Sequence, residues 1–420
     1  MTVSSAEAKS HIVVIGAGIV GLCAARELLA RRFKISVVDP NPPGGGCSFG
    51  NAGVFAVWSC APLSLPGEWK LAPAWLFSRN GPLSIHWRRL PALTPWLLRF
   101  VRAGRADRVA EISGAMFALY NSGLDLYREI LRGIGHEDLV RDSCYVYAYR
   151  DPKRADLNQT ANRIKRERGA PMRIIGSGEL HEMEPALSHE YRAAIVTERQ
   201  GRTLNPARLC EVIANEVRIA GGHFLRQQVR ALRPHGDKGC DIQIDGEVLR
   251  AARVVVAAGA WSHKLIAPLG VHVPLEAGRG YHLMYDGDGA RLNNSVTDPE
   301  LHIAASSIEG GLRISGMMEF AGLEAPPFER NFRTLDRLAR RLIPDLGGQP
   351  TSEWVGHRPT TPDTLPVIGP LPNHPSILLA FGHGQLGLTG APLTGRIIGA
   401  LAAGESLNID LTPYRADRFA

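Results

Sequence analysis

A glycine-rich turn near the start of the chain, set between an apolar strand and a small-residue helix, constrains the fold most. Residues Ile12–Ile15 predict a buried β-strand, and Gly16, Gly18 and Gly21 follow it at GxGxxG spacing. Gly16 permits the turn, Gly18 lets the backbone approach a pyrophosphate, and Gly21 lets the helix pack closely on the strand. A second predicted strand ends on Asp39, whose carboxylate can accept hydrogen bonds from both hydroxyls of an unphosphorylated ribose. The arrangement predicts a Rossmann-like α/β domain that binds FAD or NAD.

Length and composition restrict the class of protein. A chain of 420 residues, 45% hydrophobic and 21% charged, predicts a globular protein of two or three domains. No run of about 18 apolar residues occurs, so a membrane-spanning helix is not expected. The six cysteines have neither CxxC nor zinc-ligand spacing and are expected to be reduced thiols.

The formal net charge is +7, which raises the question of a nucleic-acid partner. The basic residues are interpreted as dispersed, and no nucleic-acid recognition motif accompanies them, so a nucleic-acid partner is not expected. The charge instead favours an anionic substrate or a membrane surface.

The first half of the chain contains a loop, an aromatic and basic segment, and several predicted elements. Glycine, proline, serine and asparagine dominate residues 40–53, which predicts an irregular loop able to lie against a flat ligand. Five of the seven tryptophans lie in residues 58–108, interleaved with lysine and arginine. Periodicity then predicts a helix over residues 106–133, a strand over 144–149 and a charged surface helix over 152–169.

The second half returns to strand and helix patterns typical of nucleotide-binding domains. The predicted helices cover residues 206–220, 332–342 and 388–403. The predicted strands cover residues 224–232, 241–249 (as a hairpin), 280–285, 311–317 and 377–381. Residues 253–262 are predicted to be a buried strand that runs into a turn of small residues. We therefore expect a discontinuous FAD-binding domain (residues 10–60, 195–262 and 350–415) and an antiparallel-sheet α+β substrate domain (61–194 and 263–349).

Several longer motifs follow the GAGIVG turn in a fixed order. They are Ser48–Gly53 (SFGNAG), Val255–Ser262 (VVAAGAWS), Gly280-Tyr281, Gly356–Asp363 (GHRPTTPD), Pro366–Gly369 (PVIG) and Gly382–Thr389 (GHGQLGLT). In wording and order they resemble the D-amino-acid oxidase and dehydrogenase family of flavoproteins, most of all its bacterial D-amino-acid dehydrogenase branch (small-subunit type). The resemblance covers nearly the whole chain.

The resemblance implies non-covalent FAD, although Cys47 lies near the expected flavin position. Twenty-one residues are implied to hold it: Gly16, Gly18, Ile19, Val20, Gly21, Asp39, Pro40, Ser48, Asn51, Ala52, Gly53, Val229, Ala258, Gly259, Trp261, Gly384, Gln385, Leu386, Gly387, Leu388 and Thr389. The helix that begins near Gly387 would stabilise negative charge on the reduced flavin through its N-terminal N–H groups.

Four residues are implied to form the substrate side of the site. Arg358 resembles the family's carboxylate-binding arginine, whose planar guanidinium fixes the rotation of a carboxylate. Tyr281 could hydrogen-bond the same carboxylate, cover the substrate or be a core tyrosine, and His383 could be catalytic or structural. His302 and His357 are weaker candidates. His357 replaces a residue that is often apolar in the family, which suggests D-proline or hydroxy-D-proline as substrate.

The implied reaction is oxidative deamination of a D-amino acid by hydride transfer from Cα to flavin N5, for which no general base is needed. The electrons would pass to a quinone or electron-transfer protein. Two alternatives stay open: an oxidase of the same family acting on D-amino acids, glycine or sarcosine with O₂, and a non-catalytic dinucleotide-binding redox sensor. The protein is expected to be cytoplasmic, with peripheral contact of residues 58–108 at the inner face of a membrane.

Overall fold

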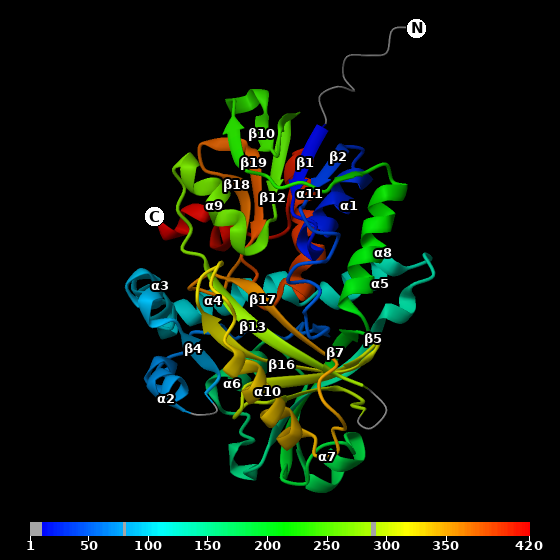
Figure 1. The fold of residues 1–420 in the computed structure, drawn as a ribbon, viewed down its shortest axis with the longest axis vertical. Coiled ribbons are helices and arrows are strands. Elements are labelled where there is room, and N and C mark those ends of the chain that lie inside the picture. The colour runs from blue at the N-terminus through cyan, green and yellow to red at the C-terminus, as the bar shows by residue number, and fades with distance from the viewer. Residues whose placement is uncertain (1–10, 79–80, 287–290) are drawn as a thin grey trace. The chain divides into compact units, whose positions relative to one another are not determined.

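The computed structural model describes residues 11–78, 81–286 and 291–420, and the chain divides into two compact units (Figure 1). Unit 1 comprises the described part of Met1–Phe49 together with Ala207–Leu275 and Pro359–Ala420. Unit 2 comprises Gly50–Pro206 and Glu276–Arg358. The expected domain segments differ from these bounds: residues 50–60, 195–206 and 350–358 belong to unit 2, and 263–275 belong to unit 1.

Unit 1 is built on a six-stranded sheet in the order β18-β19-β12-β1-β2-β8. These strands are β1 (His11–Ile15), β2 (Lys34–Val38), β8 (His223–Leu225), β12 (Arg253–Val256), β18 (Val367–Leu371) and β19 (His374–Phe381). All neighbouring pairs are parallel except β18 with β19. This is the Rossmann-like sheet that the sequence predicts, and in such sheets ligands bind beyond the carboxyl ends of the strands.

Helices and a small second sheet complete unit 1. The helices are α1 (Ile19–Ala30), α8 (Pro206–Ile219), α9 (Ser262–Ile266) and α11 (Gly387–Ala403). Helix α11 packs so closely on α1 that a Cβ on Gly395 would lie 2.7 Å from the Cys23 backbone. The second sheet contains β9 (Ala231–Pro234), β10 (Cys240–Ile244) and β11 (Glu247–Ala251). The single strand expected over residues 224–232 is therefore wrong, because β8 and β9 belong to different sheets.

Unit 2 contains a ten-stranded sheet whose main order is β17-β13-β16-β15-β14-β5-β7-β3, with β4 beside β16 and β6 beside β7. Its strands are β3 (Val54–Phe55), β4 (Leu83–Ile85), β5 (Val140–Tyr149), β6 (Met172–Gly176), β7 (Ala193–Thr203), β13 (Glu276–Tyr285), β14 (Ser295–Asp298), β15 (Ile303–Ile308), β16 (Gly311–Phe320) and β17 (Ser352–Thr360). The pairings are mostly antiparallel, as predicted, but β14 with β5 and β16 with β4 are parallel.

The helices of unit 2 are α2 (Ala72–Phe77), α3 (Leu90–Ala103), α4 (Ala106–Tyr120), α5 (Gly123–Leu131), α6 (Thr160–Glu167), α7 (Ser177–Met183) and α10 (Glu329–Leu342). Helix α10 buries Phe332, Leu335 and Leu338 in the same apolar cluster as the side chains of β13 and β16. Among the described residues, no helix combines the length and the apolar character needed to cross a bilayer.

Two helix predictions need correction. The helix expected over residues 106–133 is two helices, α4 and α5, separated at Asn121 and Ser122. The surface helix expected over 152–169 is only α6 after a short 3₁₀ turn, and it is not entirely a surface element. The Lys165 side chain is buried and donates to the Tyr147 hydroxyl at 3.0 Å, an inward contact that the run of charged residues concealed.

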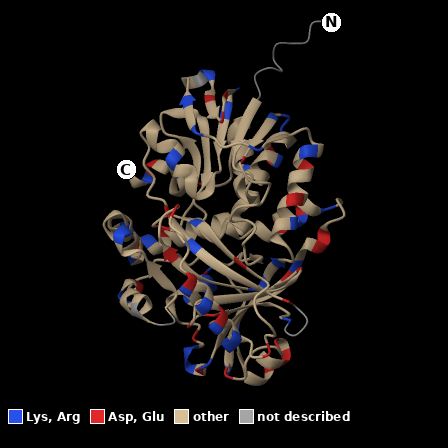
Figure 2. Cartoon of the chain, viewed as in Figure 1, with Lys and Arg blue, Asp and Glu red and all other residues tan. Residues whose placement is uncertain are grey.

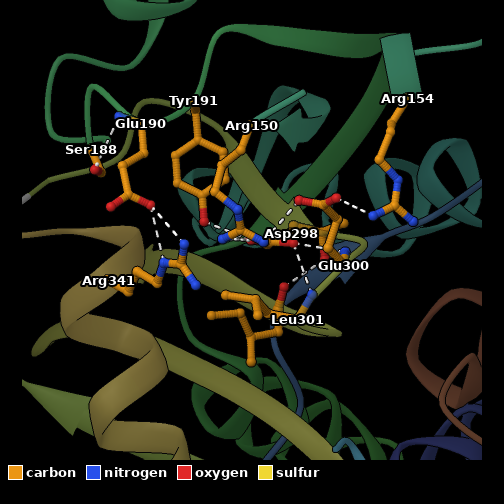
Figure 3. A network of polar contacts seen from close by, with 11 residues as sticks. Arg150, Arg154, Ser188, Glu190, Tyr191, Asp298, Glu300, Leu301 and Arg341 are labelled. Carbon is orange, nitrogen blue, oxygen red and sulfur yellow. Dashed lines mark hydrogen bonds and ion pairs between the residues drawn. The ribbon is translucent and has the colours of Figure 1, made fainter. Parts of the chain in front are cut away.

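A buried carboxylate organises one end of the unit 2 sheet (Figure 3). Asp298 accepts hydrogen bonds from the Tyr191 hydroxyl at 2.6 Å and from the backbone N–H groups of Glu300 and Leu301. Arg150 lies 3.1 Å from Asp298 and also contacts Glu300 at 2.8 Å. These hydrogen bonds and ion pairs satisfy the buried carboxylate on several sides and tie β5, β7 and β14 together.

Candidate active site

Two of the three motif glycines, Gly16 and Gly21, occupy positions that no other residue fits. Gly16 has a φ of +107°, and a Cβ there would lie 2.4 Å from the carbonyl oxygen of Ala257. A Cβ on Gly21 would lie 2.0 Å from the carbonyl oxygen of Gly16. The turn and the close packing of α1 on the sheet therefore both require glycine, for the two reasons that the sequence predicts.

Gly18, the middle glycine of the motif, leaves room beside the start of α1. A Cβ on Gly18 would meet only the Ser48 hydroxyl, at 3.4 Å. The Ile19 N–H donates to that hydroxyl at 2.9 Å, and the Ala17 N–H donates to the Asp39 carboxylate at 2.8 Å. A helix start with an uncovered glycine, a hydroxyl and a carboxylate fits the pyrophosphate and ribose of FAD. Val20 lies in the same first turn, and Pro40 follows Asp39.

The remaining predicted cofactor residues of unit 1 lie in two turns and one short connection. Ala258, Gly259 and Trp261 follow β12, the strand that pairs with β1, so they lie at the same edge of the sheet as Gly16. Residues 384–389 form the turn before α11 and its first residues; Gln385 is exposed, whereas Leu386, Leu388 and Thr389 are buried. Val229 lies between β8 and β9 and packs against the apolar core of this unit.

His383 has a structural environment. Its side chain is buried and its Nε2 lies 2.9 Å from the Thr394 hydroxyl on α11. Burial lowers the pKa of His383 to about 3, so the ring is neutral at ordinary pH. The contact links the turn before α11 to the second turn of that helix. It favours the structural alternative for His383 over the catalytic one.

Arg358 lies flat across the face of the unit 2 sheet. It belongs to edge strand β17, and its guanidinium lies over Gly280 of neighbouring β13, where a Cβ would come within 2.1 Å of Nη2. Its Nη1 donates to the carbonyl oxygen of Met317 at 2.8 Å. Gly280 therefore makes the space for Arg358, and Met317 orients it.

A β-bulge provides the Met317 carbonyl. On β13 one residue, Gly280, lies between Arg279 and Tyr281, whereas two residues of β16 lie between their partners Glu319 and Gly316. Met317, one of the two, has a φ of +62°, a left-handed conformation that is uncommon for a residue with a side chain. A strained position that holds a cationic side chain is typical of a functional site.

Tyr281 and His357 lie on the other face of this sheet. Side chains alternate along a strand, so the residues next to Gly280 and Arg358 point away from the guanidinium. Tyr281 is buried beside Phe332 of α10 and donates to Glu319, and burial raises its pKa to about 12. Burial and the nearby Arg279 lower the pKa of His357. The expected sharing of one substrate carboxylate by Tyr281 and Arg358 therefore finds no support, and the core-tyrosine alternative is favoured.

Side chains on the sheet face that carries Arg358 hold the loop of Asn51, Ala52 and Gly53 in place. Arg313 donates to the Asn51 carbonyl oxygen at 2.6 Å, and the Asn51 side chain accepts from the Gly53 N–H at 2.8 Å. The Trp354 ring packs directly over Gly50, where a Cβ would lie 2.0 Å from the ring.

His282 also contacts this loop and the Trp354 ring. Its ring stacks on Trp354 with 5.0 Å between centroids, and one ring nitrogen contacts the Gly50 carbonyl oxygen at 3.2 Å. Burial and the charge of Arg313 lower the pKa of His282 to about 3, so the ring is neutral. Sequence reasoning missed Arg313, His282 and Trp354; the only signal was the i, i+2, i+4 spacing of Trp354, Gly356 and Arg358, which places them on one strand face.

His302 lies next to the bulge. It precedes Ile303, whose partner on β16 is Gly316, and its ring forms a T-shaped pair with Trp75, with 5.2 Å between the ring centroids. Burial lowers its pKa. Of the three histidines considered for the substrate side, His302 is the one that this pairing places beside the Met317 region.

Comparison with known proteins decides the family. A family model described as FAD dependent oxidoreductase (DAO) matches residues 11–401. The chain belongs to this family. It is 32% identical over 417 residues to a D-amino-acid oxidase of Bradyrhizobium diazoefficiens, covering 97% of this chain and 99% of the relative. A D-amino acid dehydrogenase of the same organism is 27% identical over the same shares of both chains.

Solved structures show the same fold. Glycine oxidase from Geobacillus kaustophilus aligns with a TM-score of 0.72 at 22% identity, covering 97% of this chain and 98% of that one. L-proline dehydrogenase from P. horikoshii aligns with a TM-score of 0.74 at 18% identity, covering 98% and 97%. The protein is therefore an FAD-dependent oxidoreductase with the DAO fold, and FAD rather than NAD is its cofactor.

Proposed function

We propose that the protein catalyses the oxidative deamination of small D-amino acids. The observation that carries the proposal is the position of Arg358, spread over Gly280 and oriented by the Met317 carbonyl. A guanidinium held in one plane can bind both oxygens of a carboxylate, and it thereby fixes which α-substituent of the substrate faces the oxidant. The names of the two curated relatives support D-amino acids as the substrate class.

FAD, when bound, supplies the acceptor for the hydride that leaves Cα. The residues of this chain bind and orient the two partners. Gly18, Ser48 and Asp39 hold the dinucleotide end, and the loop at Asn51 is kept in place by Arg313. No side chain needs to remove the Cα proton as a base, which agrees with the low pKa of the buried His383 ring and with the contact of its Nε2 with the Thr394 hydroxyl.

The choice of substrate side chain stays open within the class of small D-amino acids. The suggestion of D-proline or hydroxy-D-proline depended on a polar His357 beside the substrate. Because His357 lies on the opposite sheet face from the Arg358 guanidinium, it gives that suggestion no support.

We propose a quinone or an electron-transfer protein as the electron acceptor, at the inner face of a membrane. The dehydrogenase relative supports this choice, while the oxidase relative at 32% identity supports O₂ as the second candidate. A redox sensor without catalysis is less well supported, because a sensor has no need of the glycine that makes room for Arg358.

Steady-state turnover with D- and L-enantiomers tests the proposal. We expect oxidation of small D-amino acids with a quinone-like dye as acceptor and little peroxide in air. High peroxide yield would assign the protein to the oxidases, and turnover of L-enantiomers or N-methylglycine alone would remove the D-amino-acid proposal. Arg358→Ala should raise KM strongly with FAD retained; loss of FAD would show that Arg358 serves the cofactor.

A further inference from the structure

The excess positive charge of the whole protein lies in one short segment. Residues 69–106, here called the basic segment, contain one lysine, six arginines and no aspartate or glutamate. The other 382 residues contain 41 basic and 41 acidic side chains and are formally neutral. The expectation that the basic residues are dispersed is therefore wrong, because a count over the whole chain hides this local excess.

The same segment exposes an unusual number of large apolar side chains. Trp87 is 77% exposed, Leu98 56% and Trp69 54%. Six of the eleven large hydrophobic residues exposed among the described residues belong to it: Trp69, Leu71, Trp87, Leu90, Leu98 and Val101. Single exposed apolar residues are ordinary, but a cluster rimmed by charge marks an interaction surface.

Helix α3 has one face that attaches the segment to the sheet and another face that is exposed to solvent. One face carries Leu93 and Trp96, which pack with Phe320 of β16 in a small apolar cluster. An exposed stripe lies on a different face and consists of Leu90, Thr94, Leu98 and Val101, with spacings of four, four and three residues. The helix is therefore held by its own buried stripe, and the exposed one is not needed for folding.

The basic side chains of the segment are placed to meet negative charge from outside. Among the described residues, Lys70, Arg88, Arg99 and Arg102 have no carboxylate within 4 Å, whereas Arg89 contacts Glu276 at 3.3 Å. Lys70 and Arg88 lie over the rings of Trp69 and Trp87, with 5.9 and 5.4 Å to the ring centres. Figure 2 shows blue, the colour of lysine and arginine, on the ribbon of α3.

We infer that the basic segment docks on the surface of a membrane that contains anionic lipids. Tryptophan and leucine side chains would enter the headgroup region, and the unpaired lysine and arginines would contact lipid phosphates. Nucleic acid would match the charge but gives no reason for the exposed Leu90, Leu98 and Val101. The inference deepens the membrane position proposed above, on which it rests, and it does not depend on the proposed substrate.

Vesicle flotation with the purified holoenzyme tests this inference. We expect binding to vesicles with about 30% phosphatidylglycerol, weak binding to phosphatidylcholine alone, and release at high salt. Each basic residue near a membrane contributes about fivefold to binding, so Arg88→Gln/Arg99→Gln/Arg102→Gln should weaken it about 100-fold.

The matched control removes the same charge elsewhere on the surface. Arg132→Gln/Arg192→Gln/Arg233→Gln changes three exposed arginines outside the segment and should leave vesicle binding within about threefold. Trp87→Ala should weaken binding without changing turnover with a soluble dye.

Four results would overturn the inference: no vesicle binding, an equal loss in the control variant, equal affinity for duplex DNA, or a dimer that the arginine variant dissociates. The dimer would show that a second copy covers the surface. Turnover of D-amino acids is measured in the same samples, so failure of the substrate proposal is seen separately.

Discussion

Replacing Gly280 with alanine should disable substrate binding while leaving the fold and the cofactor intact. Gly280 does not have a positive φ, so alanine fits the backbone without strain. The new Cβ would lie 2.1 Å from Arg358 Nη2, and ordinary contact begins near 3.4 Å, so the guanidinium must move by about 1.3 Å. A misplacement of about 1 Å at a reacting centre costs about 100-fold in rate, and we expect that loss in kcat/KM.

The assay is a double-mutant cycle on kcat/KM for a small D-amino acid, combined with FAD content and urea unfolding. Gly280→Ala should lose about 100-fold alone and almost nothing in an Arg358→Ala background, because its effect acts through the guanidinium. Gly178→Ala is the matched control, since no atom lies within 4 Å of that Cβ position. An unchanged kcat/KM in Gly280→Ala, or an equal loss in both backgrounds, would refute the reasoning.

Three other predictions concern the cofactor and stability. Gly18→Ala should keep the fold and weaken FAD binding, whereas Gly16→Ala should unfold the domain because of its φ of +107° and the 2.4 Å contact; circular dichroism and flavin fluorescence separate the two. Arg313→Met removes the donor to the Asn51 carbonyl oxygen and should raise the Kd for FAD about tenfold, measured by titration of the apoprotein. Burial lowers the pKa of His383 to about 3 from about 6.5, so below pH 6.5 the unfolded chain takes up the proton first and the free energy of unfolding falls, by about 2 kcal/mol at pH 5; His383→Gln should remove this part of the pH dependence in urea titrations at pH 5 and 7.

The sequence predicts unit 1 well because local chemistry determines it. The strand before Gly16, the small residues of α1 and the acidic end of β2 each carry a signal within a few positions. The steric role of a glycine can be predicted for the same reason, because it depends only on the absence of a Cβ at that position.

The substrate side was harder to predict because it depends on contacts between distant strands. Arg358 could be found from its motif, but the Met317 carbonyl that orients it comes from a bulge with no sequence signal. Tyr281 was a reasonable candidate until strand alternation placed it on the face opposite the Arg358 guanidinium.

The distribution of basic residues was interpreted wrongly for a different reason. Arginines spaced through residues 69–106 look dispersed on the page, and only the absence of carboxylates between them reveals the excess. The exposure of Arg99 and Arg102 depends on which face of α3 is buried, and Trp96 determines this by packing on Phe320. The tryptophans of the segment accordingly have different roles: Trp96 is core, whereas Trp69 and Trp87 are surface.

Anaerobic reduction of the bound flavin tests the central claim most directly. The purified protein is mixed with one equivalent of a small D-amino acid, or of its L-enantiomer, and visible absorbance is followed without oxygen. We predict bleaching by the D-enantiomer only, and none at the same concentration in Arg358→Ala. A flavin that stays oxidised with every D-amino acid, or that the variant reduces as readily, would contradict the account.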